Sequence, residues 1–274
     1  MPAINTNAAA NAAVRYLNLN SAQETSSLSK LSSGSRITSA SDDAAGLAIS
    51  TRISSDVTTL QQAATNSSQA TSILQTADGG ASNISDILAR MKSLASESAS
   101  GTTTDSSRAY INSEFSQLSS EIDSISSGTR YSGQSLLDGT SVFATGVSVL
   151  VGSSSTDTIT VTLSSLKASA LGVSTLDVST QAGANTALTA LDTAINTVSG
   201  ARASIGAQES RFNFSSDSIS TQTQNLQSAN SAIKDVDIAA EQAKLSSAEV
   251  KTQAAVSAEA AANQMPQYLL KLLG

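Results

Sequence analysis

The stretch that decides the fold is residues 44–98, AAGLAISTRISSDVTTLQQAATNSSQATSILQTADGGASNISDILARMKSLASES. Its apolar residues recur at intervals of three and four, as in Ile49, Ile53, Val57 and Leu60. This spacing places them on one face of an α-helix. A single helix of this length would extend roughly 80 Å at 1.5 Å per residue. The stretch therefore predicts a long helix that buries its stripe against other helices.

Two pairs of residues mark the start and the middle of this helix. Asp42 and Asp43 precede it and are expected to cap it, because carboxylates favour the positive end of the helix dipole. A catalytic carboxylate pair is not expected, since no His, Cys or nucleophile motif accompanies them. Gly79 and Gly80 interrupt the stripe and mark a candidate kink, because Gly is unfavourable in a helix interior.

Two more helical stripes follow, over residues 105–128 and 186–233. Between them lies a region rich in Ser and Thr, roughly 140–180. Within it, residues 147–151 and 158–163 alternate as strands do and predict a β-hairpin. Helices before and after the hairpin must run antiparallel to bury their stripes. The expected fold is mainly α, a long antiparallel helical rod or coiled coil with a small β-hairpin insert.

The two terminal segments carry weaker stripes, diluted by Ser, Thr, Asn and Ala. We expect them to be marginal in the monomer and to fold against each other, and against neighbouring copies, on assembly as a coiled coil. The expected organisation is a core domain built from residues 1–43 and 234–274, with a rod domain of residues 44–233 between them. The last segment can place these residues on one face: Leu245, Ala248, Thr252, Ala255, Ala262, Met265, Leu269 and Leu272.

Composition excludes several classes of function. The chain has 274 residues and a net charge of -7, which argues against a nucleic-acid partner, since such binding uses a basic face. It has no Cys and no His, which removes disulfides, thiolate nucleophiles, His-based triads and Zn sites built on these residues. We expect no enzyme, cofactor or metal. No run approaches eighteen apolar residues, so no membrane insertion is expected, and the N-terminus lacks the pattern of a Sec-type signal peptide.

Several motifs, in their order along the chain, resemble those of the bacterial flagellin family. Residues 28–50 are similar to its N-terminal signature, and residues 202–207 are similar to its return helix. Residues 229–237 and 262–267 resemble the entry and the end of its last helix. The resemblance covers essentially the whole chain. The family-signature and assembly-related residues that it implies are Leu31, Gly34, Arg36, Ile37, Asp42, Asp43, Gly46, Leu47, Ile49, Arg202, Gly206, Arg211, Asp235, Asp237, Asn263, Pro266, Gln267, Leu272 and Leu273.

The resemblance implies a fold, a role and a set of partners. It implies terminal helices that form the filament core, a helical rod domain, and a minimal flagellin without outer variable domains. Such a chain is exported unfolded by the flagellar type III apparatus and self-assembles outside the cell into a filament for swimming motility. The implied partners are other copies of the chain, the cap and hook-filament junction proteins, and an export chaperone at the C-terminal segment.

Arg90, Leu94 and Glu114 match positions through which an innate immune receptor senses many flagellins. Ser93 replaces a Glu that is common in the family, which implies weak receptor binding. The Ser/Thr-rich middle could carry O-linked sugars, as in many flagellins, or be a plain polar surface; the sequence leaves both open.

Two alternatives to a filament subunit come from different classes. One is a non-polymerising protein of the same export system, such as the hook-filament junction protein, which shares the terminal helices. The resemblance to the family's mid-helix motif at residues 87–95, to its return helix and to its C-terminal motif favours the filament subunit. The other is a flagellin with a metallopeptidase insert, which needs a His-Glu-x-x-His helix that a chain without His lacks.

Overall fold

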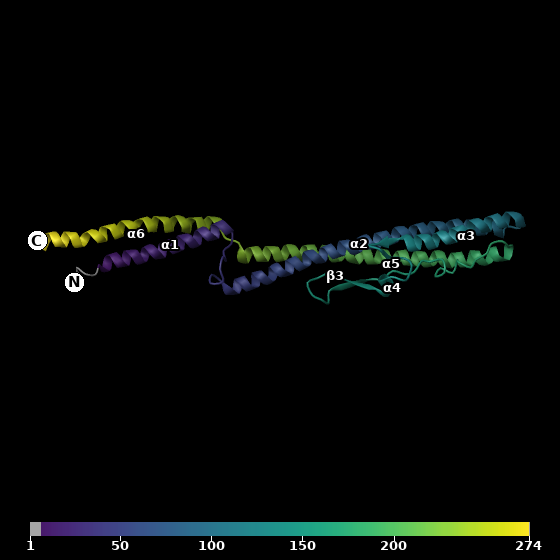
Figure 1. The fold of residues 1–274 in the computed structure, drawn as a ribbon, viewed down its shortest axis with the longest axis horizontal. Coiled ribbons are helices and arrows are strands. Elements are labelled where there is room, and N and C mark those ends of the chain that lie inside the picture. The colour runs from purple at the N-terminus through teal and green to yellow at the C-terminus, as the bar shows by residue number, and fades with distance from the viewer. Residues whose placement is uncertain (1–6, 274) are drawn as a thin grey trace. The chain divides into compact units, whose positions relative to one another are not determined.

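The computed structural model describes the backbone of residues 7–273, with the side chains of residues 7–265 and of Gln267. The described chain is mainly α-helical, which confirms the expected fold class (Figure 1). The helices are α1 (Ala8–Ser33), α2 (Ala44–Ala99), α3 (Asp105–Gly128), α4 (Val142–Thr145), α5 (Gln181–Lys234) and α6 (Ile238–Leu273). The strands are β1 (Arg130–Tyr131), β2 (Gln134–Ser135), β3 (Val147–Leu150) and β4 (Thr158–Val161).

The long helices begin at polar residues that cap them. Asn7, Asp43, Thr104, Thr180 and Asp237 each accept a hydrogen bond from a backbone N–H in the following turn. These caps satisfy N–H groups that have no partner inside the helix. The cap at Asp43 fixes the start of α2 where the sequence predicts it. The helix α5 begins at Gln181, five residues before the predicted residue 186, because Thr180 caps it.

The chain forms two compact units. Unit 1 combines Met1–Ser55 with Asn225–Gly274, and unit 2 is the continuous segment Asp56–Gln224. The helices α2 and α5 each contribute residues to both units. The division into a core domain and a rod domain at residues 43 and 234 stays a prediction, since that division concerns the assembled filament.

The core of unit 2 is a seam of α2, α3 and α5. Its largest fully buried side chains include Leu74, Leu88 and Met91 from α2, Phe115 from α3 and Phe212 from α5. Small buried residues lie between them and allow close approach of the helix backbones, which explains how a chain with only 3% aromatic residues can build this core. The buried alanines are Ala70, Ala77, Ala81, Ala95, Ala184, Ala187 and Ala194.

The two glycines in α2 do not end the helix, which continues through both. A Cβ on Gly80 would lie 2.5 Å from Thr129 Oγ1 and 2.9 Å from Leu137 Cδ1, whereas one on Gly79 would meet nothing within 4 Å. Position 80 therefore requires a glycine, because the segment that follows α3 approaches α2 closely there.

The β structure is small and lies within unit 2. β3 and β4 pair antiparallel with Val147 opposite Val161, which confirms the expected hairpin. Val151 N–H donates to Asp157 O and closes the connection. Ile159 and Val161 face the core and Thr158 and Thr160 face solvent, which is the alternation read from the sequence. A second pair, β1 with β2, surrounds Gly133 at φ 81°.

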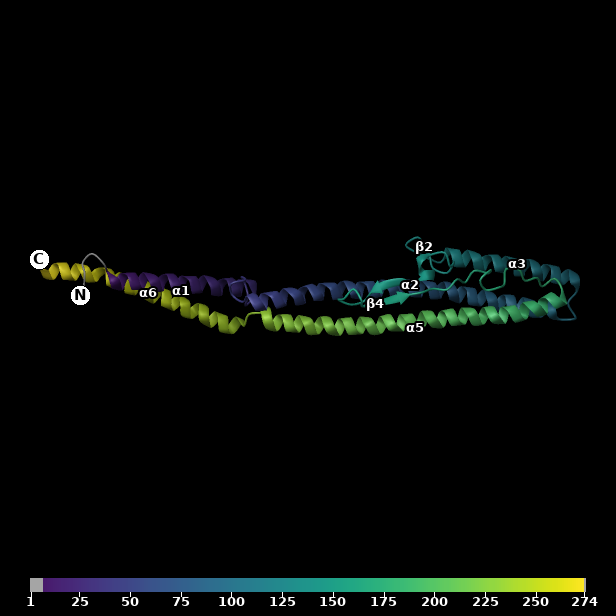
Figure 2. The same ribbon diagram turned by 90° about the horizontal axis from the view of Figure 1, so that it is seen from below.

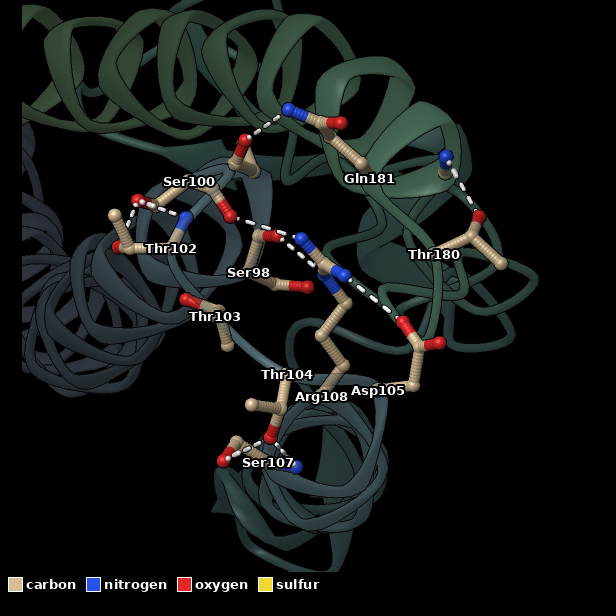
Figure 3. A network of polar contacts seen from close by, with 12 residues as sticks. Ser98, Ser100, Thr102, Thr103, Thr104, Asp105, Ser107, Arg108, Thr180 and Gln181 are labelled. Carbon is tan, nitrogen blue, oxygen red and sulfur yellow. Dashed lines mark hydrogen bonds and ion pairs between the residues drawn. The ribbon is translucent and has the colours of Figure 1, made fainter.

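A buried arginine closes the end of α2. Arg108 of α3 donates from Nε to Ser98 O and from Nη2 to Ser100 O, both at 2.8 Å, and from Nη1 to Asp105 Oδ1 at 3.0 Å (Figure 3). Gln181 Nε2 donates to Ala99 O at 2.9 Å in the same network. These side chains satisfy carbonyls at the C-terminal end of α2 that have no partner within the helix.

In unit 1, α1 and α6 pack against each other along their length (Figure 2). Asn7 Nδ2 donates to Ala262 O at 2.7 Å, and Ser27 contacts Glu241, so the two helices run antiparallel. Leu245, Ala248, Ala255 and Ala262 are buried on the predicted face of α6.

Two residues that the sequence places in apolar stripes are exposed in the single chain. They are Ile49 of α2 and Met265 of α6. For Met265, the described part of the facing helix α1 begins at Ala8, next to the contact of Asn7 with Ala262. The side chains of Leu269 and Leu272 lie outside the described residues.

Candidate functional site

The N-terminal signature segment lies against the junction between α5 and α6. Arg36 N–H donates to Lys234 O at 2.6 Å, and Val236 N–H donates to Gly34 O at 3.1 Å. Between these bonds, Ser35 and Asp235 form an isolated antiparallel bridge. Two motifs that are about 200 residues apart in sequence thus become one structural feature. We call residues 34–46 with 233–237 the clasp.

Arg36 carries the electrostatic part of the clasp. Its guanidinium donates to Ile233 O twice, from Nη2 at 2.7 Å and from Nε at 3.2 Å. The same group lies 3.8 Å from Asp43 Oδ2. A cation at this place is favourable, because the last carbonyls of α5 form the negative end of its dipole.

Gly34 and Gly46 are required by the backbone and by packing. Gly34 ends α1 at φ 66°, in the left-handed region that favours glycine. Gly46 lies over Ile37, which is only 5% exposed, and a Cβ on Gly46 would approach Ile37 Cδ1 to 2.9 Å and collide with the Asp43 carboxylate. The signature glycines thus allow the segment to turn and then close on itself.

Of the paired carboxylates of the signature, only Asp43 caps α2 as expected, because Asp42, which was also expected to cap it, holds the preceding loop instead. Asp42 Oδ2 accepts hydrogen bonds from Ser39 N–H, Thr38 N–H and Thr38 Oγ1 at 2.9–3.0 Å. These bonds, with those from the Ser39 and Thr38 backbone first, lower the pKa of Asp42 to about 2. Asp43 Oδ1 accepts from Gly46 N–H at 2.8 Å. The pair therefore fixes the loop before α2.

The seam between α1 and α6 contains one buried carboxylate. Glu241 is only 4% exposed, and its Oε1 accepts a hydrogen bond from Ser27 Oγ at 2.8 Å. Its Oε2 lies 2.9 Å from Lys244 Nζ. The Lys244 hydrogen bond first, and then the Ser27 bond, hold the pKa of Glu241 below its ordinary value despite burial. Glu241 therefore joins α1 to α6 in its charged form.

Apolar side chains remain on the surface of unit 1. All but one of them lie on α1 and α6, and they leave much apolar surface in contact with water. For example, Val250 is 66% exposed. The exposed apolar residues described in this unit are Val14, Tyr16, Leu19, Leu28, Ile49, Ile238, Val250, Val256 and Met265. These side chains are available for contacts with another molecule.

Other signature residues lie outside the clasp. Arg202 of α5 binds Asp78 of α2 through two hydrogen bonds, at 2.8 and 3.2 Å. With Gly206 they line a pocket of about 430 Å³ in unit 2. Glu209 lines the same pocket, and burial first, then the nearby Asp78, raises its pKa.

The remaining predicted residues have diverse surroundings. Leu31 and Leu47 are half-buried, and Asp237 caps α6. Arg211, Asn263 and Gln267 are exposed. The side chains of Pro266, Leu272 and Leu273 lie outside the described residues. The structure thus joins the N-terminal signature to Asp235, and it brings neither Arg211 nor Asn263 to that cluster.

The expected receptor-facing residues do not form one surface. Arg90 and Glu114 are exposed and bind each other, with two hydrogen bonds to Glu114 Oε1 at 2.9 and 2.7 Å. Leu94 is 2% exposed and belongs to the core of unit 2. Any receptor contact at this place would therefore involve the ion pair.

The sequence reading missed Arg108 and the Ser27–Glu241 contact as structural residues. A lone Arg after a polar turn reads as a surface charge, and a Ser on a weak stripe reads as solvent-facing. Only the burial of Arg108 and of the Ser27–Glu241 pair in the structure shows their roles. The sole available signal is Asp105 three residues before Arg108, a spacing typical of an ion pair on a helix.

Two kinds of feature are absent from the described part of the chain, clusters of metal-binding side chains and helices able to span a membrane. It contains no group of three or more Asp, Glu, His or Cys side chains suited to a metal ion. None of its helices is long and apolar enough to cross a membrane.

Comparisons with known proteins give a consistent result. Residues 4–142 match the bacterial flagellin N-terminal helical region, and residues 188–273 match the bacterial flagellin C-terminal helical region. The chain is 36% identical over 272 residues to a flagellin of Halalkalibacterium halodurans, covering 98% of this chain and 99% of the relative.

Solved structures agree with the sequence comparisons. The crystal structure of Bacillus cereus flagellin matches with a TM-score of 0.52 and 33% identity, over 61% of this chain and 94% of that one. A putative flagellar hook-associated protein from Vibrio parahaemolyticus matches with a TM-score of 0.59 over 71% of this chain and 100% of that one. At 16% identity, this second likeness shows the fold alone.

Proposed function

The chain belongs to the bacterial flagellin family, and we propose that the α1–α6 pair of unit 1 supplies the main contacts by which it assembles, as a structural subunit, into a flagellar filament that drives swimming. The single observation that carries this proposal is the exposed apolar surface of the pair. A stable monomer would gain nothing from exposing these side chains, whereas a polymer buries them against the next copy.

The energetics favour this assignment. Burying one exposed Val, Leu or Ile contributes about 1.5–3 kcal/mol. Each copy of the chain contributes several such residues to its neighbours, and association costs an estimated 4–15 kcal/mol in lost freedom of motion. Contacts with more than one neighbour can therefore offset that cost in a polymer. The same argument supports the expectation that the terminal segments are marginal in the free monomer.

The finer roles follow from the family assignment. We infer that the chain is secreted through the type III export apparatus and works outside the cell in the filament. We also propose contacts with the cap and the hook-filament junction proteins, and with an export chaperone that binds the C-terminal segment. Innate-receptor binding is proposed as weak, because Ser93 replaces a common Glu and Leu94 is buried. Flagellins are a structural protein family, and no reaction is proposed.

A matched pair of substitutions tests the role of unit 1. Val250 on α6 is 66% exposed, and Val142 in unit 2 is 56% exposed. Purified chain at high ionic strength, which strengthens apolar burial, would be examined by sedimentation and negative-stain electron microscopy. We expect Val250→Ser to raise the concentration needed for filaments about tenfold, and Val142→Ser to leave it nearly unchanged.

A shortened chain gives the second test. Residues 44–233 should form no filaments, while the intact chain should form them. If the intact chain forms none even with seeds, the filament role fails, and a junction or accessory protein of the same export system becomes the better assignment. If Val142→Ser and Val250→Ser impair assembly equally, unit 1 is not the dominant contact.

A further inference from the structure

A groove runs along one side of the α1–α6 seam in unit 1. Its volume is about 670 Å³, and its apolar lining includes Leu19 from α1 and Ala248 from α6. Lys244 and Lys251 stand on its α6 side, and none of the eight lining residues is acidic. We call this feature the lysine groove; its full lining is Leu19, Asn20, Gln23, Ala243, Lys244, Ser247, Ala248 and Lys251.

The other side of α6 has the opposite charge. Ile238, Glu249 and Val256 are spaced by eleven and seven residues, which correspond to about three and two helical turns and place them on one flank. All three are exposed, and the two apolar residues flank the carboxylate. We call this set the acidic ridge.

The ridge and the groove lie at the same level of α6. Glu249 and Lys251 are two residues apart, which places their side chains about 200° apart around the helix. Among the described residues, neither takes part in an ion pair within the chain. The helix thus carries an unpaired anion on one flank and an unpaired cation on the other, each beside exposed apolar residues.

We propose that the lysine groove of one copy receives the acidic ridge of a second copy, with Glu249 against Lys251 and the apolar ridge residues against the apolar lining of the groove. This inference rests on the proposed filament function and names the surfaces that carry it. Two different, complementary patches on one molecule form a heterologous interface, and such an interface produces an open helical polymer when it does not close into a ring.

Charge complementarity selects a second copy as the occupant. The groove needs an anionic partner with apolar residues around the anion, and the ridge supplies both on a helix of the same chain. The contact explains why Ile238 and Val256 are exposed although they border the seam. It also explains why Lys251 has no anion of its own, while Lys244 is held by Glu241.

The test reverses the two charges separately and together. Lys251→Glu places an anion in the groove against the unchanged ridge, and Glu249→Lys places a cation on the ridge against the unchanged groove. Like charges in an interface are strongly unfavourable. In about 0.1 M salt, each single variant should raise the critical concentration for filaments at least about tenfold. The full-length double variant Lys251→Glu/Glu249→Lys should return it to within about threefold of the parent chain.

Mixing supplies a readout that misfolding cannot imitate. An equimolar mixture of the two single variants presents opposite charges at each alternating contact, so it should form filaments where neither variant does alone. The assembly defects of the two single variants should also become smaller in about 1 M salt, where the Debye length falls to about 3 Å. Arg52→Glu, at an exposed position of α2 in unit 1, is the control for the change in net charge and should assemble as the parent does.

The outcomes separate the two proposals. If the parent chain does not polymerise, the proposed filament function itself is wrong. If the parent polymerises and both single variants do so at the same concentration, the groove serves a different partner and this inference is wrong. It is also wrong if the double variant and the mixture stay as defective as the single variants, or if Arg52→Glu is equally defective.

Discussion

Ser27 and Glu241 meet across the seam between α1 and α6, with 2.8 Å between Ser27 Oγ and Glu241 Oε1, although 214 residues separate them in sequence. The hydroxyl donates to a carboxylate that is almost completely removed from water. Such a bond contributes more than a neutral one, because its acceptor is charged. This contact therefore ties the two ends of the chain into one helical pair.

Ser27→Ala should loosen the pair. The buried Glu241 would keep Lys244 but lose its other partner, at a cost of about 1–2 kcal/mol. Hydrogen exchange of the α1 and α6 amides would report this as faster opening of both helices. Ser29→Ala, at an exposed position on the same helix, should leave their exchange unchanged. Equal exchange in the two variants would show that the Ser27 bond is not stabilising.

Acid should weaken the same pair. The pKa of Glu241 in the folded chain lies below its ordinary value near 4.5. The charged form is thus favoured by folding, and its contribution is complete above about pH 4.5 and is lost as the pH falls through the lower, folded-state pKa. Helix content of the free chain, followed by circular dichroism, should fall in this acid range. Glu241→Gln should be less helical at neutral pH and should respond less to acid; an unaltered acid response would assign the effect to other groups.

The adjacent glycines of α2 should respond to alanine with opposite signs. Gly79→Ala should stabilise unit 2 by about 0.5–1 kcal/mol, because the site is open and Ala favours the helix. Gly80→Ala should destabilise it by about 1–3 kcal/mol, because the new Cβ would collide with Thr129 and Leu137. Thermal unfolding of the two variants measures the difference, and a stabilising Gly80→Ala would contradict the close approach.

Arg108→Ala should be the most damaging charge removal in unit 2. It leaves the Ser98 and Ser100 carbonyls without the guanidinium, at an expected cost of about 2–4 kcal/mol (Figure 3). Arg108→Lys should recover only part of the lost stability, since an ammonium group cannot reproduce the planar set of donors of the guanidinium. Arg90→Ala removes an exposed ion pair and should cost less than about 1 kcal/mol. Comparable melting temperatures for the Arg108 and Arg90 alanine variants would refute this ranking.

The sequence by itself determined the helices, the hairpin and the family. The period of three and four in residues 44–98 follows from helix geometry, and the alternation in residues 158–161 follows from the pleat of a strand. The cap at Asp43 is likewise local, because its bond joins residues three apart. Patterns of this kind are visible in sequence since both partners lie within one turn.

Only the tertiary structure decided which distant groups meet. The Arg36 guanidinium reaches the carbonyl of Ile233, and Thr129 leaves no room for a side chain at Gly80. A local sequence pattern can encode neither contact, because the partners are far apart in the chain. The same limit explains why the burial of Leu94 and Arg108 is not apparent from the sequence around them. Burial is a property of everything that packs around a residue, so a stripe predicts that a helix has a buried face but not where its partner ends. That is why Ile49 and Met265 continue their stripes in sequence and yet remain exposed in the single chain.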